Sequence, residues 1–527
     1  MTPTNSVVPC GCAFLAETPS QIFSAEQFAG DEALMISTAE QFSRREVLPI
    51  VERLDHQEDG LMPGLIHKAG ELGLCGVDTP EAYGGLGLSK NLAARILEFM
   101  SLNGSVSVTY GITSGISQVG LALFGNEKQK NKYLPLLATG EWIGAYALSE
   151  PNSGSDALSA TTRADRVGNK YVLNGAKMWI SNAKWADLFL VLAKVDGERF
   201  SAFLVEKDFP GVSVSREEYK MGLKGSSTAR LILENAEIPV ENLLHQEGLG
   251  HHVAFNALNI GRFKLASMSI GLARDAIGLA ANYALDRKQF GQPISSFGLI
   301  QKKFALMATW FYAAESMIYR TGALIDSAFE STGGSIEGNR KAAEEYSIEC
   351  SACKVFSTEA ESLIIDEALQ CYGGYGFTEE FPIARHYRDA RVSRIYEGTN
   401  EINRLFIADR LMRRVKEGRV SGIAIGDSFL SELAGKAIEL APRDQIGIGA
   451  LSDVLLLTYA EQSARLRAQQ VGGSAPMLYQ AILPWLNLRG AEAFQTLSGE
   501  SVVLPSAGRP EFEAISQLVY TRKGPAL

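Results

Sequence analysis

The spacing of hydrophobic residues divides the chain into a helical part, a β-rich part and a second helical part. Between residues 31 and 145, apolar residues recur every three or four positions, which is typical of amphipathic helices. From about 146 to 245 the pattern changes to short β-rich runs between Asn-Gly, Asp-Gly and Pro-Gly turns, which predicts a small antiparallel β-domain. The helical period then returns in three long segments that we predict to form a bundle: 263–287, 300–329 and 339–370.

A helical tail follows the bundle, after a glycine-bearing joint at 417–426. Leu451, Leu455 and Tyr459 lie four residues apart and therefore on one helix face, which we interpret as core. The charged residues Glu461, Arg465 and Arg467 are expected in solvent. The pattern predicts five segments: an N-terminal arm (1–30), an N-terminal helical domain (31–145), a middle β-domain (146–249), a C-terminal helical bundle (250–413) and a C-terminal helical extension (414–527).

Composition and charge narrow the class of protein. Of the 527 residues 46% are hydrophobic and 21% are charged, so the chain can bury several cores and is not dominated by disorder. The net charge is −10 and no basic run is present, which argues against a nucleic-acid partner. No Lys or Arg precedes Arg44, so neither a secretory signal nor a transit peptide is indicated. We expect a cytoplasmic, bacterial protein, and we interpret the long uncharged stretch 99–126 as buried wall rather than a membrane span.

Cysteine and histidine positions give no sign of a metal site. Six scattered cysteines are too few for a disulfide framework in a chain of this length. The Cys350-x-x-Cys353 pair lies inside a helical run rather than at a helix N-terminus, so we predict a packing role for it. Cys10 and Cys12 are expected in a mobile terminus. No second Cys or His pair has ligand spacing, and we predict that no metal is bound.

Common nucleotide and hydrolase motifs are missing from the sequence. No Gly-x-Gly-x-x-Gly run opens a helix after a strand, no Walker-type Gly-Lys-Ser/Thr is present, and no Gly-x-Ser-x-Gly stands between strand and helix. Five polar, turn-rich segments remain. They are 146–156 (YALSEPNSGSD), 177–182 (KMWISN), 286–293 (DRKQFGQP), 370–377 (QCYGGYGF) and 388–404 (RDARVSRIYEGTNEINR).

Together and in this order, the five segments closely resemble the acyl-CoA dehydrogenase family over residues 31–413. The segments 259–263 and 297–301, together with the extension, look most like the very-long-chain branch of that family. The resemblance implies an α+β, mostly α fold: an N-terminal helical domain, a middle antiparallel β-domain and a C-terminal four-helix bundle, here with an extra C-terminal helical domain. It also implies FAD as cofactor and acyl-CoA as substrate.

The resemblance assigns the cofactor residues in three groups. The first is expected to hold the flavin from the β-domain and consists of Tyr146, Leu148, Ser149, Gly154, Ser155, Trp179, Ile180 and Ser181. The second comprises Arg287, Gly373 and Gly374, which are expected to complete the FAD site of a neighbouring subunit, and the further cofactor residues Phe290, Gln301 and Gln370. The third, at the positive start of a helix, consists of Thr399, Asn400 and Glu401. Without the resemblance, an ordinary turn, a core tryptophan, a surface salt bridge and a helix cap would explain the same residues.

Glu397 is the expected catalytic base, because it stands in an Ile-Tyr-Glu-Gly-Thr run that matches the family's base motif. Some family members place the base immediately before the residue that matches Arg262, where this chain has Gly261. The resemblance assigns Ser155, Asn259, Arg262 and Gly398 to the substrate. An ion pair between helices remains the alternative role for Arg262.

The function implied is α,β-dehydrogenation of acyl-CoA, with a long-chain fatty acyl group, to trans-2-enoyl-CoA in fatty-acid β-oxidation. Electrons would pass to electron-transferring flavoprotein. An oxidase that uses oxygen, and an assembly or docking protein with residual activity, are the alternatives; a nitroalkane-oxidising relative would carry Asp at position 397. A homodimer is expected, with the extension covering the surface that a second dimer occupies in tetrameric members. The apolar face of the extension around Leu451 is interpreted as core. The alternative is that the extension attaches the protein peripherally to the inner membrane.

Overall fold

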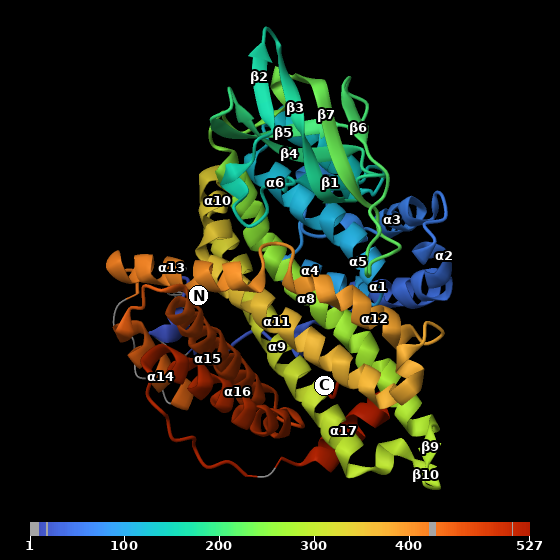
Figure 1. The fold of residues 1–527 in the computed structure, drawn as a ribbon, viewed down its shortest axis with the longest axis vertical. Helices are drawn as coiled ribbons and strands as arrows, with labels where there is room; N and C mark the ends of the chain where they lie inside the picture. The colour runs from blue at the N-terminus through green and yellow to red at the C-terminus, as the bar shows by residue number, and fades with distance from the viewer. Residues whose placement is uncertain (1–9, 17–18, 421–427, 509) are drawn as a thin grey trace. The chain divides into compact units, whose positions relative to one another are not determined.

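The computed structural model describes residues 10–16, 19–420, 428–508 and 510–527. The chain divides into two units (Figure 1). The sheet unit comprises residues 30–264 and 334–344, and the bundle unit comprises the described residues up to 29 together with 265–333 and 345–527. Because these two units combine separate stretches of the chain, they do not test the five predicted segment boundaries, which remain predictions. The expected arm and joint lie partly outside the described residues, because these exclude 1–9, 17–18 and 421–427.

Side chains cap the starts of α4, α5 and α7 in the sheet unit. The hydroxyl of Ser89 accepts the amide of Leu92, and Asn126 forms a capping box with Gln129. Residues 99–126 lie largely buried in the later helices, which confirms the interpretation of this stretch as wall. Among the described residues, no helix combines the length and apolar character needed to cross a bilayer. The helices are α1 (Asp31–Phe42), α2 (Val51–Asp55), α3 (Leu61–Glu71), α4 (Lys90–Met100), α5 (Gly104–Gly111), α6 (Ser117–Phe124) and α7 (Glu127–Ala138).

The β-rich part forms an eight-stranded sheet with the order β6-β7-β3-β2-β4-β5-β8, and β1 pairs with β4. The strands are β1 (Gly144–Ala147), β2 (Arg163–Val167), β3 (Lys170–Ser181), β4 (Leu188–Val195), β5 (Arg199–Glu206), β6 (Val212–Val214), β7 (Thr228–Pro239) and β8 (Leu243–Leu244). Most strand pairs of the predicted antiparallel domain are antiparallel, whereas β1 and β2 both run parallel to β4. Neither parallel pair is joined by a hairpin. The chain between β2 and β4 forms β3, which runs antiparallel to β2, and it reverses once more before β4, so β4 runs in the direction of β2.

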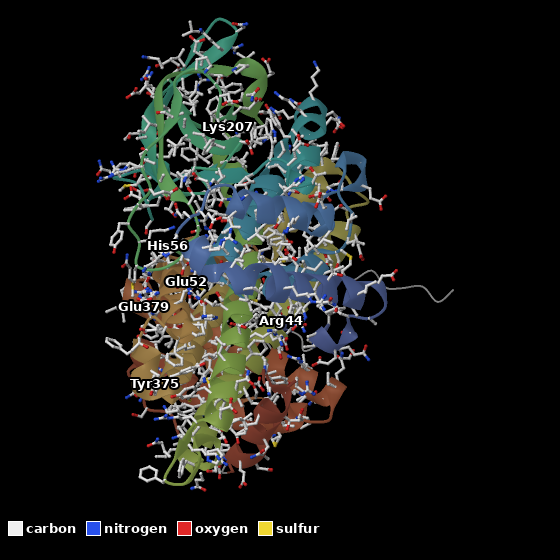
Figure 2. The ribbon with its side chains drawn as sticks, turned by 90° about the vertical axis from the view of Figure 1, so that its right-hand side faces the viewer. Arg44, Glu52, His56, Lys207, Tyr375 and Glu379 are labelled. Atoms are coloured by element: carbon white, nitrogen blue, oxygen red, sulfur yellow. The ribbon has the colours of Figure 1, made fainter. Side chains whose placement is uncertain are left out.

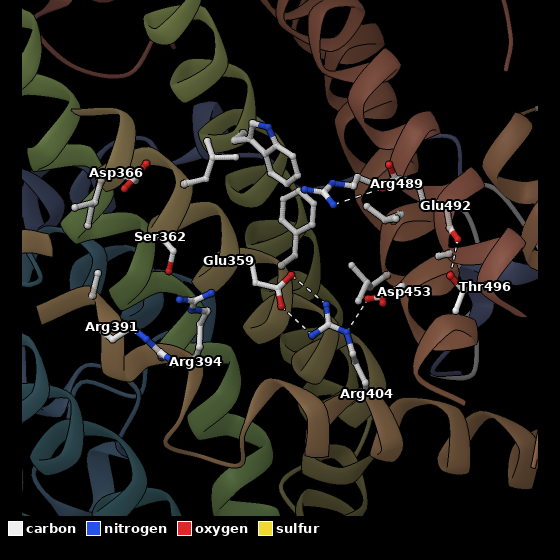
Figure 3. A pocket seen from close by; sticks show the side chains of 18 of the residues that line it. Glu359, Ser362, Asp366, Arg391, Arg394, Arg404, Asp453, Arg489, Glu492 and Thr496 are labelled. Carbon is white, nitrogen blue, oxygen red and sulfur yellow. Dashed lines mark hydrogen bonds and ion pairs between the residues drawn. The ribbon is translucent and has the colours of Figure 1, made fainter. Parts of the chain in front are cut away.

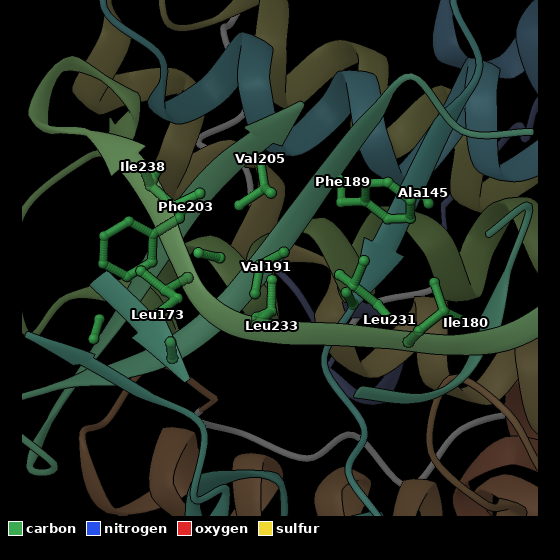
Figure 4. Packing of buried hydrophobic residues seen from close by; sticks show 14 of the residues in the cluster. Ala145, Leu173, Ile180, Phe189, Val191, Phe203, Val205, Leu231, Leu233 and Ile238 are labelled. Atoms are coloured by element: carbon green, nitrogen blue, oxygen red, sulfur yellow. The ribbon is translucent and has the colours of Figure 1, made fainter. Parts of the chain in front are cut away.

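Two strands buried along almost their whole length, β4 and β5, form the centre of the sheet's core. Val191 and Phe203 face each other across β4 and β5, and both side chains are fully buried. Figure 4 shows these two residues in one cluster with Phe189 of β4 and with Leu231 and Leu233 of β7. The sheet thereby offers a rigid support for the turns at its ends.

Long helices make up the bundle unit. They are α8 (Gly250–Asp286), whose residues up to 264 belong to the sheet unit, α9 (Gly298–Glu330), α11 (Ser347–Tyr372), α12 (Pro382–Ala390) and α13 (Asn400–Lys416). Helix α8 begins thirteen residues before the predicted start at 263. The predicted helix 339–370 is two helices, because Tyr346 interrupts the chain between α10 (Ile336–Glu345) and α11. A short hairpin of β9 (Lys288–Gln289) and β10 (Gln292–Pro293) connects α8 to α9.

The extension forms α14 (Phe429–Leu440), α15 (Gln445–Val471), α16 (Ala475–Ser498) and α17 (Phe512–Arg522), and α15 packs against α9. Leu451, Leu455 and Tyr459 are buried, which confirms their interpretation as core. Glu461 and Arg467, predicted in solvent, are 0% and 1% exposed. Arg467 is buried because its Nη2 meets Glu315 of α9 at 2.7 Å, so a carboxylate compensates the loss of water.

The N-terminal cysteines also differ from expectation, because Cys12 is fully buried in the bundle unit. The amide of Gly11 donates to Glu345 at 2.7 Å, and the amide of Cys12 donates to Glu349 at 2.5 Å. These bonds to the end of α10 and the start of α11 tie down a segment predicted to be mobile. The predicted packing role of Cys350 and Cys353 is confirmed, since both lie buried in α11.

Candidate active site

The candidate base lies in a turn with unusual backbone geometry. Glu397 has a φ of 54° and Gly398 a φ of 81°, and α13 begins two residues later. A left-handed backbone is costly for a residue with a side chain, so the surrounding structure must enforce it at Glu397. Thr399 caps the helix, since its hydroxyl oxygen accepts the amide of Ile402 at 3.2 Å.

Two buried side chains enforce this turn from inside the bundle unit. The ammonium group of Lys354, in α11, donates to the carbonyl oxygen of Gly398 at 3.0 Å. The amide of Asn403 donates to the same carbonyl at 2.9 Å and to the carbonyl of Thr399 at 3.1 Å. Both side chains are fully buried, so water does not compete for these bonds. Sequence reasoning missed both residues; the available signal was a lysine inside an apolar helical run.

The start of α13 shows which predicted cofactor residues remain accessible. The Asn400 side chain is used within the protein, because its oxygen accepts Lys354 at 2.7 Å and its amide donates to Thr358 and Glu359. Only its main chain can therefore serve a ligand. Glu401 is exposed, and backbone amide and Thr399 hydroxyl hydrogen bonds lower the pKa of its carboxyl. The first amides of any helix lack partners within it, so this end favours an anionic or polar acceptor.

The second group of predicted residues gathers at the opposite end of α11. The guanidinium of Arg287 lies 5.3 Å from the ring centroid of Tyr375, which Figure 2 shows at the surface together with Glu379. Apart from the glycines and their chain neighbours, no atom of the described residues lies within 4 Å of the positions that a Cβ would take at Gly373 and Gly374. This part of the surface also carries exposed aromatic side chains, Phe290 at 93% and Phe377 at 90%. Open backbone, a cation and bare rings suit a nucleotide or a partner surface.

In the sheet unit, a buried ion pair shapes the turn after β1. Lys177 on β3 meets Glu150 at 2.7 Å and also donates to the carbonyl of Leu148 at 3.1 Å. Glu150 in addition accepts the amides of Thr161 and Thr162. Although burial opposes ionisation, the charge and hydrogen bond of Lys177 lower the pKa of Glu150 to about 2. Sequence reasoning overlooked both members of the pair, of which Lys177 holds the carbonyl of the predicted flavin residue Leu148.

The same strand presents Trp179 to solvent. The pairing of β3 with β7 shifts register between Lys177 and Ile180, so a β-bulge lies at this point. Trp179 has a φ of 62° and is 56% exposed, whereas its neighbour Ile180 is buried. The bulge thus turns a large aromatic ring outward beside the Leu148 turn, whose Ser149 carbonyl accepts the amide of Met178. Gly154 and Ser155 lie exposed in the loop that follows.

The predicted substrate residues on α8 are less accessible. Arg262 and Asn259 are 7% and 2% exposed, and a guanidinium nitrogen of Arg262 lies 3.4 Å from the Asn259 oxygen. Residues three apart share one helix face, which explains this contact. The hydroxyl of Tyr146, a predicted flavin residue, has a partner within the protein, since it donates to the carbonyl of Ala254 at 3.5 Å.

These features fit an FAD molecule. A flavin ring needs a flat apolar contact and hydrogen bonds at its polar edge, which Trp179 and the turn at Ser149 supply. Its diphosphate needs cations and closely approachable backbone, which Arg287, Gly373 and Gly374 supply. The chain therefore has residues suited to both parts of the cofactor.

Three family models match consecutive parts of the chain: the acyl-CoA dehydrogenase N-terminal domain over residues 30–141, the middle domain over 145–236 and the C-terminal domain over 248–412. A probable acyl-CoA dehydrogenase of Bacillus subtilis is 48% identical over 431 residues, 80% of this chain and 73% of that protein. The human mitochondrial very long-chain specific acyl-CoA dehydrogenase is 38% identical over 411 residues, 75% of this chain and 60% of that protein. The crystal structure of an acyl-CoA dehydrogenase from Bacillus anthracis complexed with FAD has a TM-score of 0.90 at 40% identity and covers 98% of this chain and 100% of that chain.

Proposed function

This chain belongs to the acyl-CoA dehydrogenase family, and on that basis we propose that it dehydrogenates an acyl-CoA between Cα and Cβ to the trans-2-enoyl-CoA, with Glu397 as the base. The observation that carries the proposal is the Glu397 turn, in which buried hydrogen bonds maintain a backbone conformation that a glutamate rarely adopts. Strain of this kind persists where function requires a side chain in one orientation.

Each group in the turn then has a task. The Glu397 carboxylate accepts the α-proton of the thioester, and the amide of Glu397 donates to the thioester oxygen as negative charge develops there. Gly398 leaves space for the thioester beside the backbone. When bound, FAD supplies the acceptor for the hydride that leaves Cβ.

We assign the flavin to the turn at Leu148 and Ser149 with Trp179, Ile180 and Ser181, and the helix start at Thr399 to the same ring. Substrate contacts are assigned to Ser155, Arg262 and Gly398, with Asn259 as the support of Arg262. The buried Arg262–Asn259 contact favours this assignment because it holds the guanidinium in one orientation. We also propose that the acyl group is a long fatty chain and that the electrons pass to electron-transferring flavoprotein.

A homodimer is also proposed, because the two cofactor groups of the bundle unit lie at opposite ends of α11. Lys354, which contacts the Glu397 turn, and Gly373 are 19 residues apart, which corresponds to roughly 28 Å along a helix. The flavin ring and diphosphate of one FAD lie much closer together than this. Arg287 and Gly373 are therefore assigned to the FAD of a second copy.

An anaerobic titration of the purified protein with saturated acyl-CoAs of four to about twenty carbons tests the proposal. Bleaching of the flavin absorbance with a clear optimum of chain length is expected. Bound flavin that no straight-chain thioester bleaches would contradict the proposed reaction. Release of peroxide in air at the rate of turnover would show that oxygen, rather than electron-transferring flavoprotein, accepts the electrons.

A further inference from the structure

The C-terminal extension contacts the helix that follows the catalytic turn. Asp453, on α15, accepts a hydrogen bond from the Nε of Arg404, on α13, at 2.7 Å. The hydroxyl of Ser452, the preceding residue, donates to the main-chain carbonyl of the same arginine at 2.5 Å. Arg404 lies one turn after Asn400, so α15 contacts both the side chain and the main chain of the first part of α13.

From Arg404, a continuous set of polar contacts leads back to the turn. Two guanidinium nitrogens of Arg404 donate to the two oxygens of Glu359 at 2.8 and 3.1 Å, a bidentate arrangement that sets the plane of both groups. Glu359 accepts the Asn400 amide at 3.0 Å. Asn400 in turn accepts Lys354 at 2.7 Å, and Lys354 reaches the carbonyl of Gly398 at 3.0 Å. We call these five residues the relay: Asp453, Arg404, Glu359, Asn400 and Lys354.

The relay changes from half-exposed to buried along its length. The Glu359 and Asp453 side chains are 37% and 32% exposed, whereas Lys354 and Asn400 are 0% and 3% exposed. Figure 3 shows the outer three residues on the wall of a cavity of about 700 Å³, which residues of α11, α12, α13, α15 and α16 line. A hydrogen bond that is shielded from water and fixed at both ends constrains its partners more than an exposed one does. The inner residues can therefore transmit a constraint set by the outer ones.

We propose that the extension positions the catalytic turn through the relay, with Asp453 and Arg404 as positioning residues for Glu397. This inference rests on the proposed role of Glu397 as base. The extension is then part of the active-site support, because α15 fixes α13 and the relay fixes the carbonyl next to the base. None of the outer residues needs to contact substrate or FAD.

The first test measures amide hydrogen exchange of the FAD-loaded protein without substrate. Asp453→Asn weakens the charged contact to Arg404 and does not overpack the cavity, and Ser452→Ala removes the main-chain contact without changing charge. Each is expected to speed exchange of the amides of residues 397–403 by roughly tenfold. Asp409→Asn is the matched control, because Asp409 pairs with Arg413 on the same helix at 57% and 64% side-chain exposure, outside the relay.

Exchange at 397–403 equal to that of the unchanged protein in both variants would overturn the proposal. So would an equal rise in α9, because the extension would then stabilise the bundle as a whole rather than the turn. Asp453→Glu is expected to restore slow exchange, since it retains the carboxylate.

The second test measures turnover. Asp453→Asn is expected to lower kcat about three- to tenfold at unchanged KM and unchanged FAD content, because only the position of the base is affected. A raised KM with unchanged kcat would overturn the positioning role. Full turnover of a Glu397→Gln enzyme would instead contradict the proposed role of Glu397 as base, while the exchange result would still stand. Failure of the proposed function and failure of the relay are therefore distinguishable.

Discussion

The ammonium group of Lys354 donates a 3.0 Å hydrogen bond to the carbonyl oxygen of Gly398, the residue that follows the proposed base. Lys354→Met retains the length of the side chain but removes the ammonium donor from this carbonyl, which keeps the Asn403 amide, and from the Asn400 oxygen. We expect the variant to lose about 2–4 kcal/mol of unfolding free energy, since two buried acceptors lose a charged partner. Urea unfolding of the FAD-loaded protein measures the loss. Lys341→Met is the control, because the Lys341 side chain is 77% exposed; similar losses in both variants would contradict this role.

The role of Glu397 is tested by Glu397→Gln, which retains shape and hydrogen bonding but cannot accept the α-proton. We expect yellow protein with unchanged FAD content and a kcat lower by about 10²–10⁴-fold, the usual contribution of a general base. Stopped-flow reduction of the flavin by acyl-CoA measures the chemical step directly. Glu380→Gln, at an exposed position, should reduce flavin at the normal rate. Normal reduction by Glu397→Gln would refute the assignment.

The proposed dimer predicts complementation between two inactive variants. If the base and Arg287 serve different copies of FAD, a hybrid of one Glu397→Gln chain and one Arg287→Ala chain contains one site with both defects and one intact site. Co-expression with two affinity tags isolates the hybrid, and we expect it to regain up to about half of the normal turnover per dimer. A hybrid as inactive as its parents would place both residues at the same FAD.

Glu361 predicts a pH dependence of stability. Burial raises the pKa of its carboxyl from the ordinary value of 4.5 to about 8, in spite of hydrogen bonds from Ser393 and Ser269. The folded state therefore retains a proton that the unfolded state releases between pH 4.5 and 8. The contribution of this group is full below pH 4.5 and falls as pH rises towards 8, by at most about 1.4 kcal/mol per pH unit.

Glu361→Gln should remove this slope, because its amide does not titrate. Urea unfolding at intervals from pH 5 to 9 is the measurement, with Glu417→Gln at an exposed position as the control. We expect the stability of the Gln variant relative to the unchanged protein to rise over this range. A constant difference at all pH values would show that Glu361 is ionised in the folded protein.

Local pattern predicted the elements of the fold better than their pairing. The helical and β-rich parts agree with the observed helices and sheet, because the periods of helix and strand are properties of neighbouring residues. The direction of β1 and β2 relative to β4 depends instead on the path of the connecting chain. Helix α8 starts at Gly250 rather than at the predicted residue 263. No strong stop signal lies between these two positions, so the helix continues through them.

The amino-acid sequence by itself determined the order of helical and β-rich parts, the family and the position of the Glu397 motif, because these depend on residue types at short spacing. Only the tertiary structure decided which charges are buried. Lys354, Glu150 and Arg467 are of residue types that are mostly exposed in proteins, yet each is buried against a partner far along the chain. A charge leaves water only where such partners converge, and convergence is set by packing between distant elements. The support of the catalytic turn by Lys354, Asn400 and Asp453 is therefore a property of the fold.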